Sequence, residues 1–165
     1  IVALKSSGVH SNGLTLARKV VEANNIKMTD SVSGLTKSIG KELLTPTEIY
    51  VKEVLGITKA HEVHGLVDIT GGGLRNILRM AKGLKYVIDD PVKPQPIFEV
   101  LRQLGNIGTE EAYQTFNMGM GFAIIAPEDE AESIAKENAN AKVVGRVEEG
   151  NGVYFAPEKI LYDHY

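Results

Sequence analysis

The first residues of the chain pass from an apolar run through a polar loop into a helical pattern. Residues 1–4 (IVAL) are apolar, and residues 6–13 (SSGVHSNG) are mostly small, hydroxylated or glycine and hold one histidine. Leu14 then starts a run with apolar residues at helical spacing. A strand, a polar turn and a helix N-terminus in this order present backbone N–H groups to an anion. The stretch therefore predicts a strand-to-helix connection with a candidate ligand site at its turn.

Length and charge exclude several classes of protein. The chain has 165 residues, of which 43% are hydrophobic, which suits one ordinary core and a single domain over residues 1–165. Its 18 basic and 21 acidic side chains give a formal net charge of −3, so no basic excess is present to neutralise a nucleic-acid backbone. The apolar runs are far shorter than the ~20 residues that span a membrane. We expect neither a nucleic-acid nor a membrane partner.

The chain contains no cysteine. This excludes disulfides, thiolate metal sites and cysteine nucleophiles within it, and it fits a cytoplasmic location. The sequence opens inside an apparent strand and without Met. We therefore expect a domain taken from a longer protein.

Hydrophobic periodicity predicts an α+β fold in which helices pack on a sheet. The expected strands are residues 1–5, 63–69, 84–88, 120–126, 142–147 and 152–155. The expected helices are residues 14–24, a helix starting at Pro46, 74–80, 96–104, one starting at Thr109, and 127–138. For the helix at Pro46, Thr45 is the expected N-cap and proline the first helical residue. That helix is expected to bury Ile49, Tyr50, Val54 and Leu55, and the polar residues 24–39 before it are expected to form a loop.

Three strand-to-helix loops are expected to converge at one edge of the sheet. In the first loop, His10 is the side chain that can move a proton near neutral pH. The hydroxyl and amide groups around it can bind a phosphate or substrate, and its candidate binding residues are Ser7, Gly8, Ser11 and Asn12. The alternative is that Ser11 or Asn12 only caps the following helix.

The second and third loops are rich in glycine. In Thr70, Gly71, Gly72 and Gly73, three consecutive glycines cost conformational entropy, which a cradled phosphate or carboxylate would justify. The alternative is a tight turn with close helix–strand packing. In the third loop, residues 116–121 (FNMGMG), Asn117 offers both donors and acceptors, while Phe116 and Met118 suit the core or a pocket wall.

His61 and His64 lie three residues apart and could share a helix face as metal ligands. A third ligand is not evident, so we interpret both as surface histidines and expect no metal site.

Four motifs in order resemble one family. They are residues 6–13 followed by Leu16, Arg18 and Lys19; residues 42–52 (ELLTPTEIYVK); residues 69–74 (ITGGGL) with Asn76, Ile77 and Arg79; and residues 96–101, 105–106 and 111–119 (EAYQTFNMG). Together they resemble the C-terminal domain of the AIR synthetase family, the phosphoribosylformylglycinamidine cyclo-ligases (PurM) of purine biosynthesis. The resemblance extends to about Val147.

This resemblance implies a fold, a reaction and a set of partners. The implied fold is a PurM-like C-terminal domain with three α/β/α layers, a mixed sheet flanked by helices and partly similar to ferredoxin-like folds. The implied reaction uses ATP to convert formylglycinamidine ribonucleotide into aminoimidazole ribonucleotide. ATP and Mg²⁺ would lie mostly on an N-terminal domain at a homodimer interface, so no cofactor is expected on this chain alone and the isolated domain should be inactive.

The resemblance also implies roles for the loop residues. The substrate and phosphate contacts would come from the three loops, through Ser7, Gly8, Ser11, Asn12, Thr70, Gly71, Gly72, Gly73 and Asn117. His10 would transfer a proton or contact the transferring phosphate.

Three positions depart from the family pattern. Asp68 stands where histidine is common, Glu48 where a basic residue is common, and Gln95 where an aromatic is common. These departures keep relatives in the same superfamily open: formylglycinamidine ribonucleotide synthetase, selenophosphate synthetase, thiamine-phosphate kinase or a hydrogenase-maturation protein. A non-catalytic ligand-binding or oligomerisation module is the alternative from another class.

Overall fold

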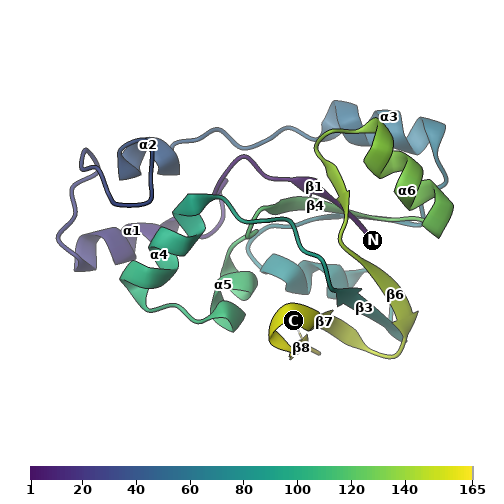
Figure 1. Ribbon diagram of the computed structural model, residues 1–165. Coiled ribbons are helices and arrows are strands. Elements are labelled where there is room, and N and C mark those ends of the chain that lie inside the picture. Colours follow the sequence, from purple (N-terminus) through teal and green to yellow (C-terminus); the bar gives the residue numbers. More distant parts are fainter. Residues whose placement is uncertain (165) are drawn as a thin grey trace.

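A computed structural model describes residues 1–164, which form helices packed around two four-stranded sheets (Figure 1). The strands are β1 (Val2–Lys5), β2 (Gly65–Asp68), β3 (Leu84–Ile88), β4 (Met120–Ile125), β5 (Ala141–Val143), β6 (Gly145–Glu149), β7 (Gly152–Phe155) and β8 (Ile160–Tyr162). The α-helices are α1 (Leu14–Ala23), α2 (Ile39–Leu43), α3 (Val51–Ala60), α4 (Pro96–Gly105), α5 (Thr109–Thr115) and α6 (Glu128–Glu137). Two 3₁₀ helices, η1 (Gly73–Arg79) and η2 (Ala156–Glu158), complete the described elements. The predicted α+β class is confirmed.

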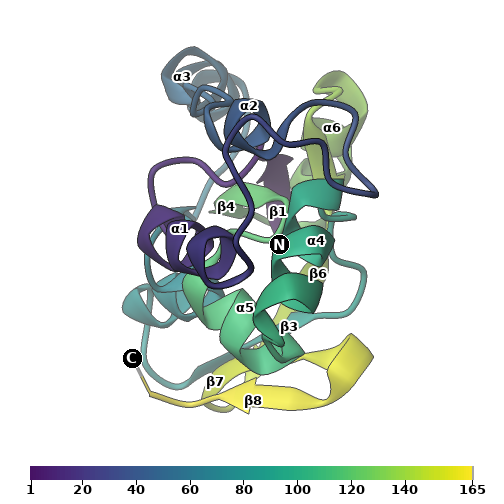
Figure 2. The ribbon, with the colours of Figure 1, turned by 90° about the vertical axis from the view of Figure 1, so that its left-hand side faces the viewer.

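The first sheet has the order β2-β4-β1-β5, and all its neighbours are antiparallel. Alternate residues of β1 point to opposite faces, so Val2 and Leu4 lie in one buried cluster and Ala3 in another. Helices α3 and α6 cover the first face (Figures 1 and 2). Helices α1, α4 and α5 lie on the other side of the sheet, where the larger core forms. The helix–sheet–helix layers expected from the family resemblance are thus present around this sheet.

The second sheet has the order β6-β3-β7-β8 and is mixed, because β3 and β7 run parallel. It joins the first sheet at Val144, between β5 and β6. The Val144 N–H donates to Ile1 O at 2.9 Å, and its carbonyl accepts from the N–H groups of Asp89 and Asp90, each at 3.1 Å. The expected single strand over residues 142–147 is therefore wrong. It is two strands on either side of a kink, one paired with β1 and the other with β3.

Helix α4 follows its sequence signals closely. Pro96 occupies the first turn, and Asn106 ends the helix in the left-handed conformation at φ 48°. The apolar face of α4 buries Phe98 completely, and its ring meets Phe116 edge-on at 5.9 Å between centroids. This pair ties α4 to the loop before β4.

The helix expected to start at Pro46 begins only at Val51, and a short helix, α2, occupies residues 39–43 instead. The Pro46 carbonyl accepts a hydrogen bond from Ser7 Oγ at 2.6 Å, and Tyr50 Oη donates to Lys5 O at 2.9 Å. These contacts hold residues 45–50 against the first loop in an irregular path. The expected burial was also wrong in part, because Ile49 is 77% and Leu55 53% exposed.

Within residues 1–164, no helix combines the length and apolar composition needed to cross a membrane.

His61 links α3 to α6. Its Nδ1 lies 2.7 Å from a carboxylate oxygen of Glu130 and its Nε2 3.1 Å from one of Glu137, and the side chain is 8% exposed. The expectation of a surface histidine is wrong here, whereas the His64 side chain is 56% exposed as expected. Hydrogen bonds to the two carboxylates, Glu130 first, raise the pKa of His61.

Because its pKa is raised on folding, His61 should stabilise the fold in acid and less in alkali. The contribution is fully present below the unfolded histidine pKa of about 6.5 and is lost as the pH rises through the higher folded value. We expect His61→Asn to reduce the free energy of unfolding more at pH 5.5 than at pH 8.5, measured by urea denaturation. His64→Asn is the matched control and should change stability little at either pH. An equal loss for His61→Asn at both pH values would contradict this account.

Candidate functional site

The three predicted loops meet around a cavity of about 240 Å³. Its lining comes from the first loop, the 47–50 segment, the end of β2 and the start of β4: Val9, His10, Ser11, Asn12, Thr47, Glu48, Tyr50, Asp68, Ile69, Thr70, Asn117 and Gly121. The Asn12 amide lies beside Gly71, so the first and second loops touch. The convergence expected from the sequence is present in the structure.

Asn117 holds the first loop in place. Its Oδ1 accepts from Ser6 Oγ at 2.8 Å and from the Gly119 N–H at 2.9 Å. Its Nδ2 donates to Gly8 O at 2.9 Å and to Val9 O at 3.3 Å. These bonds use the two lone pairs and two protons of the buried amide. The structure therefore gives Asn117 the part of a positioning residue, and direct contact with a ligand stays a prediction.

His10 sits in the left-handed region at φ 61°, an uncommon conformation for a residue other than glycine. Its Nε2 accepts from the N–H groups of Ser7 at 3.1 Å and Glu48 at 3.4 Å. Two donors on Nε2 place the proton of the neutral ring on Nδ1. Burial lowers the pKa of His10, and the nearby Glu48 carboxylate partly opposes that shift. With Nε2 occupied by these two donors, the ring presents its Nδ1–H for donation to a ligand.

Residues 45–50 form a strap over this loop, which sequence reasoning missed. Ser7 Oγ reaches Pro46 O and lies 3.0 Å from His10 Nε2, and Ser11 Oγ lies 3.3 Å from Thr47 Oγ1. Tyr50 packs near His10, with 6.3 Å between ring centroids. The sequence signal for this segment was the motif at residues 48–52 (EIYVK), which forms part of the family resemblance but was interpreted as helical.

The N-terminus of α1 is not capped by Ser11 or Asn12, so that alternative is wrong. Gly13 occupies the cap position at φ 84° and makes no side-chain bond. A Cβ at this residue would overlap the buried ring of Phe116. Glycine is needed here for both backbone conformation and space, which leaves the polar side chains of the loop free for other contacts.

The glycines of the second loop serve packing at least in part. Gly73 has φ 54°, and a Cβ there would overlap the carbonyl oxygen of Tyr113 in α5. Its N–H donates to Thr70 O at 2.9 Å, while the Thr70 N–H donates to Asn76 Oδ1 at 3.0 Å. The tight-turn alternative thus accounts for Gly73. Thr70 lines the cavity, and anion binding by Gly71, Gly72 and Gly73 stays a prediction.

A second cleft, of about 510 Å³, adjoins this cavity at Glu48, which lines both spaces, and Ser7 lines the second cleft. Three lysines contribute to it: Lys5, Lys93 and Lys142. The Lys142 ammonium is paired with Asp90 at 2.6 Å, and Lys5 donates to Ala139 O at 3.0 Å. A basic cleft therefore adjoins the His10 cavity, which suits a ligand with an anionic end.

A metal site is not evident in the part of the chain described: residues 1–164 hold no group of three or more His, Asp or Glu side chains suited to a metal ion. The His10 cavity offers two carboxylates, Glu48 and Asp68. Magnesium prefers several oxygen ligands in octahedral geometry, so these residues alone do not fit it.

Comparison with known proteins agrees with this architecture. Residues 1–156 match the family described as AIR synthase related protein, C-terminal domain. A phosphoribosylformylglycinamidine cyclo-ligase from Methanopyrus kandleri is 50% identical over 156 residues, 93% of this chain and 45% of that relative. The same-named proteins from Thermoplasma volcanium and Methanococcus vannielii are 44% and 43% identical, over 93% and 99% of this chain and 46% and 49% of their own lengths.

The fold and the loop arrangement define an α+β domain with a histidine in its candidate site. The chain belongs to the AIR synthase related family, through the C-terminal domain of that family. It spans about half the length of the curated relatives that it matches.

The packing of Gly73 against α5 gives a stability prediction. Gly73→Ala should lower the free energy of unfolding by at least about 2 kcal/mol, because it combines a left-handed backbone with a clash against a main-chain oxygen. Gly56→Ala is the control: Gly56 is exposed within α3, and a Cβ there meets nothing within 4 Å. It should be neutral or stabilise by up to about 1 kcal/mol. Chemical denaturation measures both, and equal effects would refute the packing account.

Proposed function

We propose that this chain is the C-terminal half of an ATP-dependent cyclo-ligase, which closes formylglycinamidine ribonucleotide to aminoimidazole ribonucleotide in purine biosynthesis. The carrying observation is the meeting of the three loops around a cavity lined by His10, whose Nε2 accepts the Ser7 N–H. The name of relatives 43–50% identical to this chain supports the same reaction.

The proposed reaction requires an activated amide oxygen and an amidine nitrogen positioned as the nucleophile. ATP supplies the phosphoryl group that turns the formyl amide oxygen into a leaving group. The amidine nitrogen then forms the ring C–N bond, and phosphate leaves with the former amide oxygen. Holding the nitrogen and carbon together supplies much of the rate gain. Donors aimed at the developing negative charge supply more.

The proposed roles of this chain's residues follow from the cavity. The Nδ1–H of His10 donates to a phosphoryl oxygen, and the proton released on closure of the ring leaves with the phosphate. Ser11, Asn12 and Thr70 orient the substrate from the cavity wall, and Asn117 keeps the loop in register. The lysine cleft beside Ser7 provides the complementary charge for the phosphate end of the ribonucleotide.

The remainder of the proposal concerns the complete protein. We propose that ATP and Mg²⁺ bind mostly on the N-terminal half, that the complete protein is a cytoplasmic homodimer, and that this chain alone is inactive. The match to a C-terminal domain, and the relatives' length of about twice this chain, support this division.

Activity of the complete protein tests the reaction. With formylglycinamidine ribonucleotide, ATP and Mg²⁺, we expect substrate-dependent release of ADP and phosphate. His10→Asn should lower kcat by about 10²–10⁴-fold, since it removes the ring while asparagine tolerates the left-handed backbone. His64→Asn is the control, because His64 does not line the cavity, and it should leave kcat unchanged. Absence of substrate-dependent turnover would sink the cyclo-ligase proposal, and a near-normal kcat for His10→Asn would remove His10 from the chemistry.

The pH profile gives a separate test of the role of His10. Burial lowers the pKa of His10. The decrease of kcat/KM on the acid side of its pH profile, the acid limb, should therefore have its midpoint below the ordinary histidine pKa of about 6.5. Glu48→Gln removes the carboxylate that raises this pKa while keeping the backbone N–H, so the limb should move to still lower pH. Glu130→Gln, which affects only the His61 pair, is the control and should not move it. A limb that moves to higher pH in Glu48→Gln would contradict the assignment.

A further inference from the structure

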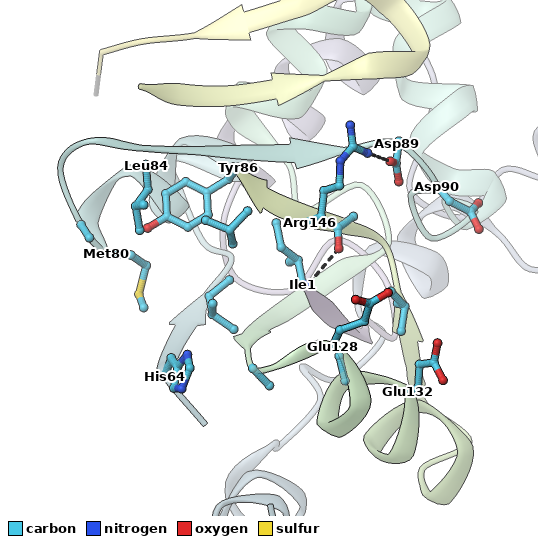
Figure 3. Close-up of a pocket in the computed structure, with 17 residues that line it drawn as sticks. Ile1, His64, Met80, Leu84, Tyr86, Asp89, Asp90, Glu128, Glu132 and Arg146 are labelled. Atoms are coloured by element: carbon cyan, nitrogen blue, oxygen red, sulfur yellow. Dashed lines mark hydrogen bonds and ion pairs between the residues drawn. The ribbon is translucent and has the colours of Figure 1, made fainter. Parts of the chain in front are cut away.

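A cleft of about 910 Å³ opens at the N-terminal end of β1, where the two sheets meet (Figure 3). Its floor is apolar and includes Met80, Leu84, Tyr86 and Ile125. Its rim carries Asp89, Asp90, Glu128 and Glu132. Asp89 is paired with Arg146 and Asp90 with Lys142, which leaves Glu128 and Glu132 as the acidic part of the rim. The cleft lies at the opposite end of β1 from the His10 loop and has no part in the proposed reaction.

One side of the cleft is the unpaired edge of β6. This strand is the outer strand of the second sheet, with β3 as its neighbour within residues 1–164. The carbonyl of Val144 and the N–H of Gly150 bond to the β3 side, which places the even-numbered residues in the hydrogen-bonded pairs with β3. Gly145 and Val147 therefore turn their N–H and C=O groups toward the cleft. An open edge of this kind is a ready template for another strand.

The other side of the cleft continues β4. Ile125 O accepts from the His64 N–H at 2.7 Å, so Ile125 faces β2. By the alternation of a strand, the next residue, Ala126, faces the β1 side. Backbone groups of both β6 and the continuation of β4 therefore face the cleft.

Strand β1 points straight into this space. The amino group of Ile1 already donates to Gly145 O at 2.8 Å, and Ile1 O accepts from Val144, so Ile1 is paired across a bulge at residues 144–145 (Figure 3). If β1 were extended upstream in the same register, the residue directly before Ile1 would pair with Ala126 on the β4 side. With the bulge included, the residue two positions before Ile1 would pair with Val147 on the β6 side.

We propose that, in the complete protein, the segment directly upstream of Ile1 continues β1 through this cleft and joins the two sheets into one. The matched relatives are about twice as long as this chain, and the family match is to a C-terminal domain, so an upstream segment is the occupant the comparisons favour. Its side chains should be apolar where they face Leu84 and Ile125, with basic residues where they reach the acidic rim. Burial lowers the pKa of the Ile1 amino group, and an uncharged peptide N–H suits the same place better.

A disulfide in the complete protein tests the register. The residue directly before Ile1 should lie opposite Arg146 in a pair without hydrogen bonds, where Cβ atoms approach closely enough for a disulfide. With other cysteines of the complete protein replaced, Arg146→Cys and a cysteine directly before Ile1 should form a bond within one molecule on oxidation. Leu161→Cys, exposed on β8 at the far edge of the second sheet, is the control partner and should not form one.

Two results would overturn the proposal: no disulfide in the Arg146→Cys protein although it remains folded, or a disulfide only between two molecules, which would make the occupant a second copy. If a cysteine variant does not fold, amide hydrogen exchange of the unmodified complete protein tests the same pairing. The amides of Ala126 and Val147 should exchange at least ~10-fold more slowly than unpaired amides. Exchange at the unpaired rate would refute the continued strand.

Discussion

The candidate site depends on one buried amide. Asn117 bonds to Ser6, Gly8 and Val9 on the first loop and to Gly119 in its own turn. Leaving such a group unpaired costs about 1–3 kcal/mol, so the loop and the turn before β4 form as a unit. Aspartate, of similar shape, has no N–H donors for the two carbonyls. An amide is therefore required at this position for its two N–H donors. By holding the carbonyls of Gly8 and Val9, Asn117 fixes the chain directly before the left-handed backbone of His10.

The sequence revealed the parts whose determinants are local. The apolar runs of β1 and β4, the proline that starts α4 and the glycine-rich turns are all local signals, and the elements formed where they predicted. The loops were also placed at one site, because strand ends in a sheet meet at one edge.

The errors have a shared cause, which is competition from distant partners. Pro46 is a good first residue of a helix, but its carbonyl is bound by Ser7 of the first loop and Tyr50 by Lys5 at the end of β1, about 40 residues earlier in the chain. Val144 sits in an apolar run that looks like one strand, yet its N–H and C=O bond to Ile1 and to Asp89 on opposite sides. His61 depends on two carboxylates of α6. No local pattern contains the identity of such partners, so these features required the three-dimensional structure.

Strand β1 connects the two regions that matter most. At its far end, the pairing of β1 with β4 shifts between Leu4 and Lys5, a local irregularity that redirects the chain into the His10 loop. At its near end, Ile1 faces the cleft between the sheets. Both edges of β1 are paired along its length, so it behaves as a stiff element about 13 Å long. A segment that extended β1 upstream would gain no direct contact with His10, but it would fix the position of the strand from which the His10 loop starts. Attachment of an N-terminal half at the upstream end of β1 would thereby set the position of the His10 loop at the other end of the strand.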